Sequence, residues 1–451
     1  MPSSVPLAAV EPPPAVEIVH DLARTQELAE QYRTAPAERG IRVTELADLR
    51  SAFWKERLRW PIAPERQATV ERGVDLHRAL GAVVGPGIAL EVRFRRAGIV
   101  GQIDALGGAV IELKTGGRGI APEEWRSHRP DALVQLVTYC ALADREEGWL
   151  VRREAPESGG ASLSVAEFRI PDLPARRAAA LARAERLREA IRTGDPSALP
   201  ACRWFDRGCE FRAEHGCTCT GTEAEDPLEI LDELPPPARR PDVEAEWSDR
   251  WRAYRPPAPV EIDEIHDLIY PRRAYFDRLE PEATSPPPPP GPADEMRARL
   301  RAAMESGPIG DLAVQLPMSA WAPGPIETWR GEPFLRRVRN QYTSPAAGEL
   351  ARAAPQIAWE LGFRCAALGT PTAHLVLGWG RCPPERSPVF VFRYRFPDLG
   401  AIARRWRGIA RALAETRADG RAERLPACPA WYAANCPHQP RCGCPSDRDS
   451  R

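Results

Sequence analysis

The sequence predicts an α/β protein that is built from two similar halves. Residues 91–116 have the pattern of strand, strand, tight turn and strand, with β-branched residues and a pair of glycines at the turn. Apolar positions within residues 133–140 then follow the spacing of a helix. A six-residue motif recurs, because Phe-Arg-Ile-Pro-Asp-Leu at 168–173 matches Tyr-Arg-Phe-Pro-Asp-Leu at 394–399.

Further matches extend this repeat along both halves. An Arg/Ala-rich stretch that is typical of a helix follows each motif and leads to Leu-Pro-Ala-Cys, which ends at Cys202 and Cys428. Upstream, Cys140-Ala-Leu and Cys365-Ala-Ala lie at nearly the same offset. Several matches in one order at a near-constant offset favour a duplication. The alternative is a compositional bias in an Arg/Ala/Pro-rich chain.

A length of 451 residues suggests two or three domains. The composition divides the chain into a Pro-rich and disordered N-terminal segment, a first domain, an acidic and Pro-rich linker and a second domain. These four parts are residues 1–15, 16–221, 222–258 and 259–451.

Charge and hydropathy exclude some classes of protein. The net charge of −1 gives no global field for binding nucleic acid, so any DNA-binding surface must be a local patch. No apolar run approaches the ~18 residues that cross a membrane, and the N-terminus lacks the pattern of a secretory signal. We therefore expect a cytoplasmic protein, in which clustered cysteines bind metal more often than they form disulfides.

Lysine is almost absent, and this scarcity singles out one position. The chain has only Lys55 and Lys114, whereas arginine is abundant. Lys114 shares a predicted strand face with Glu112, because residues two apart in a strand point the same way. Both would project toward Asp104 on the neighbouring strand. The alternative is a surface hairpin whose Glu and Lys are simply solvated.

Asp104, Glu112 and Lys114 are the residue types that phosphodiester hydrolysis needs. Carboxylate oxygens, with the backbone carbonyl of Leu113, would bind Mg²⁺ or Mn²⁺, which polarises a phosphate and activates water. A nearby lysine would orient the attacking water and stabilise the developing charge.

Three more residues could belong to the same site. Gln135 and Tyr139 are four apart on the predicted helix and therefore share a face, from which both could contact a phosphate or a water. His77 lies on a probable helix upstream and could bind the metal, although a lone histidine is more often a packing residue.

Together these residues resemble the RecB-like exonuclease family, which includes the CRISPR-associated exonucleases and the AddB-type nuclease domains. The resemblance covers roughly residues 40–220 and is carried by motifs that occur in the family's order. They are Gly73 to His77, Glu91, Gly101-Gln-Ile-Asp104, Glu112-Leu-Lys114 and Gln135 to Tyr139.

The resemblance implies a restriction-endonuclease-like mixed sheet flanked by helices, and metal-dependent cleavage of DNA, usually at single-stranded ends. It assigns metal binding to His77, Asp104 and Glu112, catalysis to Lys114, and contacts with DNA or water to Gln135 and Tyr139. It also implies DNA as the partner, with possible protein partners in a repair, CRISPR or defence complex.

Many family members also hold a 4Fe–4S cluster with one cysteine upstream of the nuclease core and three after it. This chain departs from that arrangement, because no cysteine precedes Cys140 and a four-cysteine tail follows the core instead. Four thiolates suit an iron–sulfur cluster or a tetrahedral zinc. The first tail comprises Cys202, Cys209, Cys217 and Cys219, and the second comprises Cys428, Cys436, Cys442 and Cys444.

The second half lacks the catalytic set, so we predict an inert, degenerate copy. An offset of about 225 places residues 334–339 opposite the Glu112 strand without a carboxylate–lysine pair, and Glu360 and Arg364 replace Gln135 and Tyr139. An Arg-rich strand region could bind a DNA backbone, or it could be a solvated basic face. Its residues are Arg330, Arg336, Arg337 and Arg339.

Three functions follow from these patterns. The first is an active DNA exonuclease with an inert copy that serves as a clamp or scaffold. The second is a non-catalytic iron–sulfur or zinc protein that binds nucleic acid or a partner, and the third is a zinc-stabilised adaptor. Only the first requires the intact set of Asp104, Glu112 and Lys114.

Overall fold

The structure is a computed structural model of the whole chain. It describes residues 13, 15–35, 40–58, 79, 81, 83–85, 88–115, 120–154, 162–201, 211, 228–253, 270–279, 291–315, 325–341, 346–382, 386–427 and 438. His77, all eight cysteines of the two predicted tails and most of the predicted N-terminal segment 1–15 lie outside these residues.

The chain is a mixed α/β protein that divides into two compact units. Unit 1 comprises residues 1–35, 256–304 and 314–451, and unit 2 comprises residues 36–255 and 305–313. In the described part of the chain, no helix combines the length and the apolar character that a membrane span requires.

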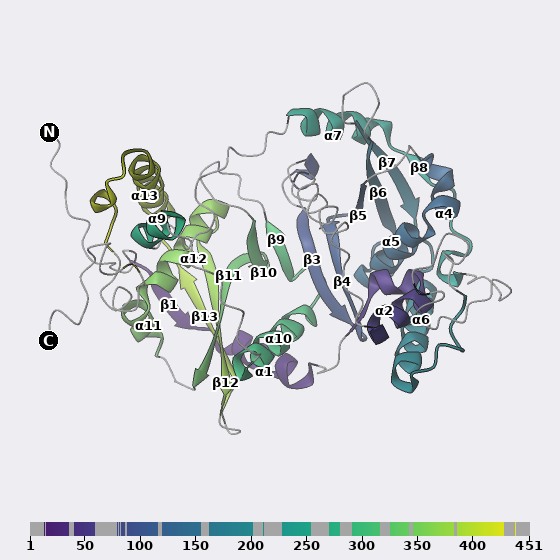
Figure 1. Ribbon diagram of the computed structural model, residues 1–451, viewed down its shortest axis with the longest axis horizontal. Coiled ribbons are helices and arrows are strands. Elements are labelled where there is room, and N and C mark those ends of the chain that lie inside the picture. Colours follow the sequence, from purple (N-terminus) through teal and green to yellow (C-terminus); the bar gives the residue numbers. More distant parts are fainter. Residues whose placement is uncertain are drawn as a thin grey trace. The chain divides into compact units, whose positions relative to one another are not determined.

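The strands of unit 2 have the order β3-β4-β5-β6-β7-β8 (Figure 1). Strand β2 pairs with β4. Strands β5 and β6 are parallel, whereas the other neighbours in this order are antiparallel. The pattern of residues 91–116 is confirmed, since β3, β4 and β5 occupy it. The strands are β2 (Ile41–Arg42), β3 (Ala89–Arg96), β4 (Ile99–Leu106), β5 (Val110–Thr115), β6 (Glu147–Glu154), β7 (Ser162–Arg169) and β8 (Ala238–Arg239).

Helix α5 (Pro130–Ala143) connects the parallel strands β5 and β6 and packs closely on the sheet. Its first residue is Pro130, which needs no N–H partner there, and Asp144 ends it in a left-handed conformation. A Cβ on Gly148 of β6 would lie 2.8 Å from Cys140 Sγ of α5, so glycine permits the close approach.

The remaining helices of unit 2 surround this strand–helix–strand element. They are η1 (Val43–Ala47), α2 (Leu49–Leu58), η2 (Pro122–Glu124), α4 (Trp125–His128), α6 (Leu173–Thr193), η4 (Glu229–Leu231) and α7 (Pro241–Ala253). Helix α7 falls within the segment that composition indicates as a linker. It is amphipathic and buries Trp247, which packs on Trp149 at a ring-centroid distance of 5.6 Å.

In unit 1, the strands β1, β13, β12, β11 and β10 are neighbours in that order. Strands β11 and β12 are parallel, and β13 is antiparallel to both β12 and β1. The strands are β1 (Glu17–His20), β10 (Ile326–Trp329), β11 (Glu332–Gln341), β12 (Thr372–Arg381) and β13 (Val389–Arg395). The division of the chain between the two units falls within strand β9 (Leu312–Gln315).

The helices of unit 1 repeat dimensions that are found in unit 2. Helix α12 (Pro355–Leu368) has 14 residues, begins with proline and ends at a left-handed residue, as α5 does. Helix α13 (Leu399–Asp419) has 21 residues and an aspartate N-cap, as α6 does. The others are α1 (Leu22–Thr34), α9 (Pro271–Leu279), α10 (Pro292–Glu305), α11 (Ala347–Ala353) and η5 (Ala422–Arg424).

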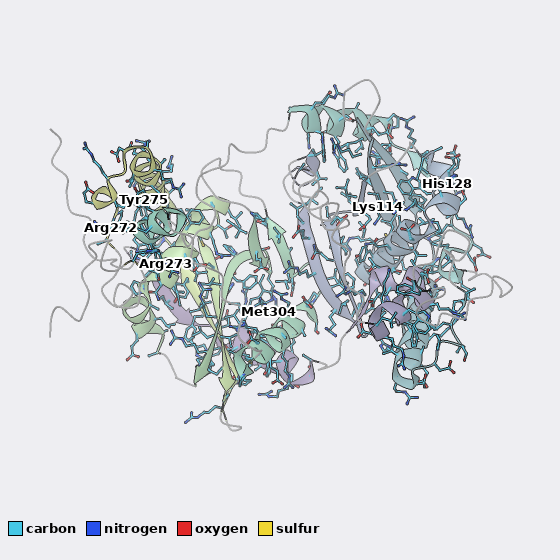
Figure 2. All side chains as sticks on the ribbon, viewed as in Figure 1. Lys114, His128, Arg272, Arg273, Tyr275 and Met304 are labelled. Atoms are coloured by element: carbon cyan, nitrogen blue, oxygen red, sulfur yellow. The ribbon has the colours of Figure 1, made fainter. Side chains whose placement is uncertain are left out.

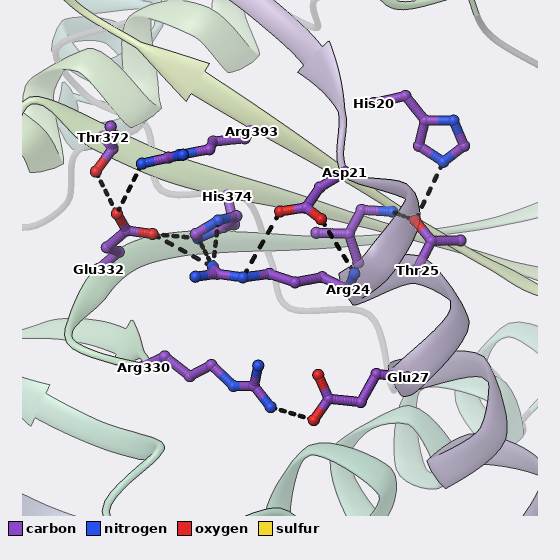
Figure 3. Close-up of polar contacts among 11 residues, drawn as sticks. His20, Asp21, Arg24, Thr25, Glu27, Arg330, Glu332, Thr372, His374 and Arg393 are labelled. Atoms are coloured by element: carbon purple, nitrogen blue, oxygen red, sulfur yellow. Dashed lines mark hydrogen bonds and ion pairs between the residues drawn. The ribbon is translucent and has the colours of Figure 1, made fainter.

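The N-terminal segment 17–34 is part of unit 1, where β1 extends the sheet beside β13. Arg24 of α1 contacts the buried His374 ring and donates to Glu332, with Nη1 3.3 Å from Oε2 (Figure 3). Glu332 also accepts a hydrogen bond from Thr372 and lies 3.8 Å from Arg393. This polar cluster joins α1 to the start of β11 and β12.

Candidate active site

Asp104 lies where the regular pairing of β4 and β5 ends. The register pairs Ala105 with Ile111, and its continuation by one step would put Asp104 opposite Glu112. The Asp104 carboxylate accepts the backbone N–H of Leu113, with Oδ2 2.8 Å from the nitrogen. The Asp104 side chain thus accepts a hydrogen bond that a backbone carbonyl of the neighbouring strand would accept in a regular sheet. This bond holds Asp104 against the strand that carries Glu112 and Lys114.

Strand alternation breaks at the same place. Ile103 and Leu106 both belong to the core cluster that includes α5, although residues three apart in a regular strand face opposite ways. On β3, Glu91 has a φ of 45°, a left-handed conformation that a non-glycine residue rarely adopts. Leu90 pairs with Ala105 and Val92 with Ile103, so this strained residue lies opposite Asp104. Such irregularities in strands often re-aim side chains at functional sites.

A chain of hydrogen bonds links β5 to α5. Lys114 Nζ lies 2.7 Å from Glu112 Oε1 and 2.7 Å from Gln135 Oε1, and Gln135 Nε2 lies 3.1 Å from the Tyr139 hydroxyl. Figure 2 locates Lys114 among the strands of unit 2. The structure thus brings four of the predicted site residues together in one network.

Burial makes this network unusual for charged groups. Asp104 is 8% exposed and Glu112 is 2% exposed, while the Lys114 side chain keeps 17% of its surface. Two buried carboxylates beside the Lys114 ammonium place hard oxygen donors in a site with little access to water. Buried carboxylates of this kind require a cationic partner.

Tyr139 is held at the far end of the network by aromatic packing. Its ring packs edge to face on Phe94 at a centroid distance of 5.9 Å. Burial, together with the negative charges of Glu112 and Asp104, raises the pKa of Tyr139 well above its usual value, against the opposing hydrogen bond from Gln135. Its hydroxyl is therefore neutral at working pH and can both donate and accept a hydrogen bond.

Two charged residues that were not predicted from the sequence flank Lys114. Arg152 of β6 pairs with Lys114 in the parallel register and is buried. Asp131, in the first turn of α5, is bound by Arg129 and interacts electrostatically with Lys114. Burial raises the pKa of Asp131, but its hydrogen bond with Arg129 and the charges of Arg129 and Lys114 outweigh that effect and lower it.

The donor set fits a hard divalent cation such as Mg²⁺ or Mn²⁺. Asp104 and Glu112 supply carboxylate oxygens, which these ions prefer, on adjacent strands. Leu113, expected to contribute its carbonyl, uses its N–H to hold Asp104. Within the described residues no three His, Cys, Asp or Glu side chains gather into a metal-binding group, and the predicted third ligand His77 lies outside them.

Comparisons with known proteins relate the N-terminal half of the chain to a nuclease superfamily. Residues 13–221 match the model of the PD-(D/E)XK nuclease superfamily. No curated protein matches the chain. Among solved structures, the crystal structure of SSO0001 is similar at 23% identity over 41% of this chain and 90% of that one, with a TM-score of 0.28.

A second similar structure is the crystal structure of LHK-Exo in complex with dAMP. It is 18% identical over 37% of this chain and 94% of that one, with a TM-score of 0.26. The family model covers all of the described network of Asp104, Glu112, Lys114, Gln135 and Tyr139. Residues 13–221, which include most of unit 2, therefore carry the sequence pattern of the PD-(D/E)XK nuclease superfamily.

Proposed function

We propose that this protein is a metal-dependent DNA nuclease that hydrolyses phosphodiester bonds, acting as an exonuclease on single-stranded ends. One observation carries the proposal. Lys114, one of two lysines in the chain, is hydrogen-bonded between Glu112 and Gln135 beside the buried Asp104, within a nuclease superfamily domain.

Asp104 and Glu112, with His77 as a third ligand, would hold Mg²⁺ or Mn²⁺. When bound, such a cation polarises the scissile phosphate and lowers the pKa of a bound water. The N–H of Leu113 fixes the Asp104 carboxylate, so this ligand is oriented before the metal arrives.

Lys114 would orient the attacking water and stabilise the negative charge that develops on the phosphate. Its position depends on Gln135, whose side-chain carbonyl accepts from Nζ, and on Tyr139, which in turn contacts the amide of Gln135. Because hydrogen bonds already hold the Lys114 ammonium in place, it needs little reorganisation during the reaction. This preorganisation is the main source of its catalytic benefit.

The finer features remain part of this proposal. The four-cysteine tail of each half would bind a 4Fe–4S cluster, or zinc as the alternative. Unit 1 would be a degenerate, inert copy, and the matching lengths and caps of α5 with α12 and of α6 with α13 support this duplication. DNA would be the substrate, with protein partners in a repair, CRISPR or defence complex.

The test is degradation of end-labelled single-stranded and duplex DNA by anaerobically purified protein with Mg²⁺ or Mn²⁺. Lys114→Ala should lose at least ~100-fold in rate, equivalent to about 2.7 kcal/mol of barrier, because the oriented cation is removed. Lys55→Ala is the matched control, since Lys55 is an exposed residue in the last turn of α2. Equal cutting by wild type and Lys114→Ala would refute the assignment.

A further inference from the structure

Unit 1 contains a hydrogen-bonded network at the place that corresponds to the Lys114 network. Arg337 Nη2 lies 2.7 Å from Glu360 Oε2, and Arg364 Nη2 lies 3.0 Å from Glu360 Oε1. Glu360 and Arg364 are the sixth and tenth residues of α12, as Gln135 and Tyr139 are of α5. The same geometry therefore joins a strand to the following helix in both units.

Strand register supports this correspondence independently. Lys114 pairs with Arg152, the sixth residue of β6, and Arg337 pairs with Leu377, the sixth residue of β12. By the same count, Leu335 takes the place of Glu112. Leu335 is buried and belongs to the apolar core of unit 1.

The place of Asp104 is also apolar in unit 1. The antiparallel register of β10 and β11 pairs Thr328 with Pro333, and its continuation puts Ile326 opposite Leu335. Ile326 is fully buried in the same core. With both carboxylate positions apolar, unit 1 has lost the set that would bind a metal at this place.

The substitutions reverse the charge of the site. In unit 2 the five positions carry two carboxylates and one lysine, whereas in unit 1 they carry two arginines and one glutamate. Glu360 uses one oxygen for each guanidinium and so holds Arg337 and Arg364 side by side with a net positive charge. The Arg337 side chain is 46% exposed, and Arg339, two residues along the same strand face, is also exposed.

We propose that Arg337 and Arg364, held by Glu360, form an anion site that binds a backbone phosphate of DNA. Guanidinium groups match phosphate geometry, and a carboxylate that fixes two of them lowers the entropy cost of binding. The choice of DNA as the ligand rests on the proposed function of unit 2. Of the four arginines predicted as a basic strand region, Arg330 lies instead in the turn before β11, where it pairs with Glu27.

The test measures binding of a fluorescent single-stranded oligonucleotide by the full chain in EDTA, so that cleavage plays no part. The double variant Arg337→Gln/Arg364→Gln should weaken binding about tenfold and reduce the salt slope by about 0.7, the value for one lost phosphate contact. Arg407→Gln on α13 is the matched control, because Arg407 is exposed in the same unit and bonds its own helix.

Glu360→Gln tests whether the carboxylate positions the two arginines. The proposal predicts weaker binding, because the guanidinium groups lose the group that fixes them, whereas tighter binding would show that net charge alone attracts DNA and would overturn the positioned site. Arg337→Lys should retain part of the binding, since it keeps the charge at an exposed position but loses the guanidinium geometry.

The proposal would be overturned if the double variant had the affinity and the salt slope of wild type. It would also be overturned if polyglutamate of the same total charge displaced the DNA, because the surface would then bind any acidic polymer. This failure is distinct from failure of the nuclease assignment. Loss of cleavage in Lys114→Ala would still stand if the arginine variants bound DNA normally.

Discussion

Gly101 shows how one missing side chain sets the geometry of the candidate site. A Cβ at this position would lie 2.8 Å from Phe94 Cζ and 2.8 Å from Tyr139 Cε1, closer than real contacts allow. We therefore expect Gly101→Ala to displace Tyr139, to destabilise unit 2 by about 1–3 kcal/mol and to lower the cleavage rate. Denaturant unfolding and the DNA degradation assay would measure the two effects.

Gly108→Ala provides the control for that substitution. Gly108 lies in the turn between β4 and β5, and a Cβ there would meet no atom within 4 Å. It should leave both stability and cleavage within about 0.5 kcal/mol of wild type. Wild-type behaviour of Gly101→Ala would mean that the Tyr139 ring is not fixed by this contact.

Spacing and scarcity made some residues of the site predictable. The two-residue spacing put Glu112 and Lys114 on one face, and the rarity of lysine drew attention to Lys114. Asp131 and Arg152 had no such signal. Asp131 comes near Lys114 from the first turn of α5, and Arg152 through the parallel pairing of β5 with β6. The left-handed backbone of Glu91 is likewise a property of the folded strand pair.

At the scale of elements, the cluster that joins α1 to β11 and β12 predicts acid sensitivity of unit 1. Burial, with the charge of Arg24, lowers the pKa of His374 to about 4. The unfolded chain then binds more protons than the folded one between about pH 6.5 and 4, so stability is complete above this window and falls as the pH drops. The contribution of His374 to this slope should not exceed about 1.4 kcal/mol per pH unit, the value for one proton.

Thermal unfolding between pH 7 and 4.5 would test this expectation. His374→Gln should flatten the pH dependence, because its side chain does not titrate, even if it lowers stability overall. His128→Gln, at an exposed site on α4, should keep the wild-type slope. An unchanged slope in His374→Gln would assign the acid sensitivity to other groups.

Local elements were more predictable than their long-range partners. The strands of residues 91–116 and the helix over residues 133–140 follow from local periodicity, and both are confirmed. The pairing of β1 with β13 links positions almost 380 residues apart, and nothing in the local sequence indicates it. The segment 222–258 contains α7 because the apolar face of this helix, including Trp247, packs on Trp149 of β6.

For the molecule as a whole, the two units have separate apolar cores. Leu150 is fully buried in one core and Leu375 is fully buried in the other. Each is the fourth residue of the strand that follows α5 or α12, so the two leucines form a matched pair. Because each core excludes the residues of the other, we expect two unfolding transitions in calorimetry.

Leu150→Ala and Leu375→Ala should each destabilise by about 2–5 kcal/mol, because a buried leucine leaves a cavity. Leu150→Ala should lower the transition of unit 2 and abolish cleavage at a lower temperature than in wild type. Leu375→Ala should lower the unfolding temperature of unit 1 and weaken DNA binding at temperatures close to that transition. Cleavage by unit 2 should be lost at the same temperature as in wild type. A single transition that both substitutions shift equally would show that the two cores unfold as one cooperative unit.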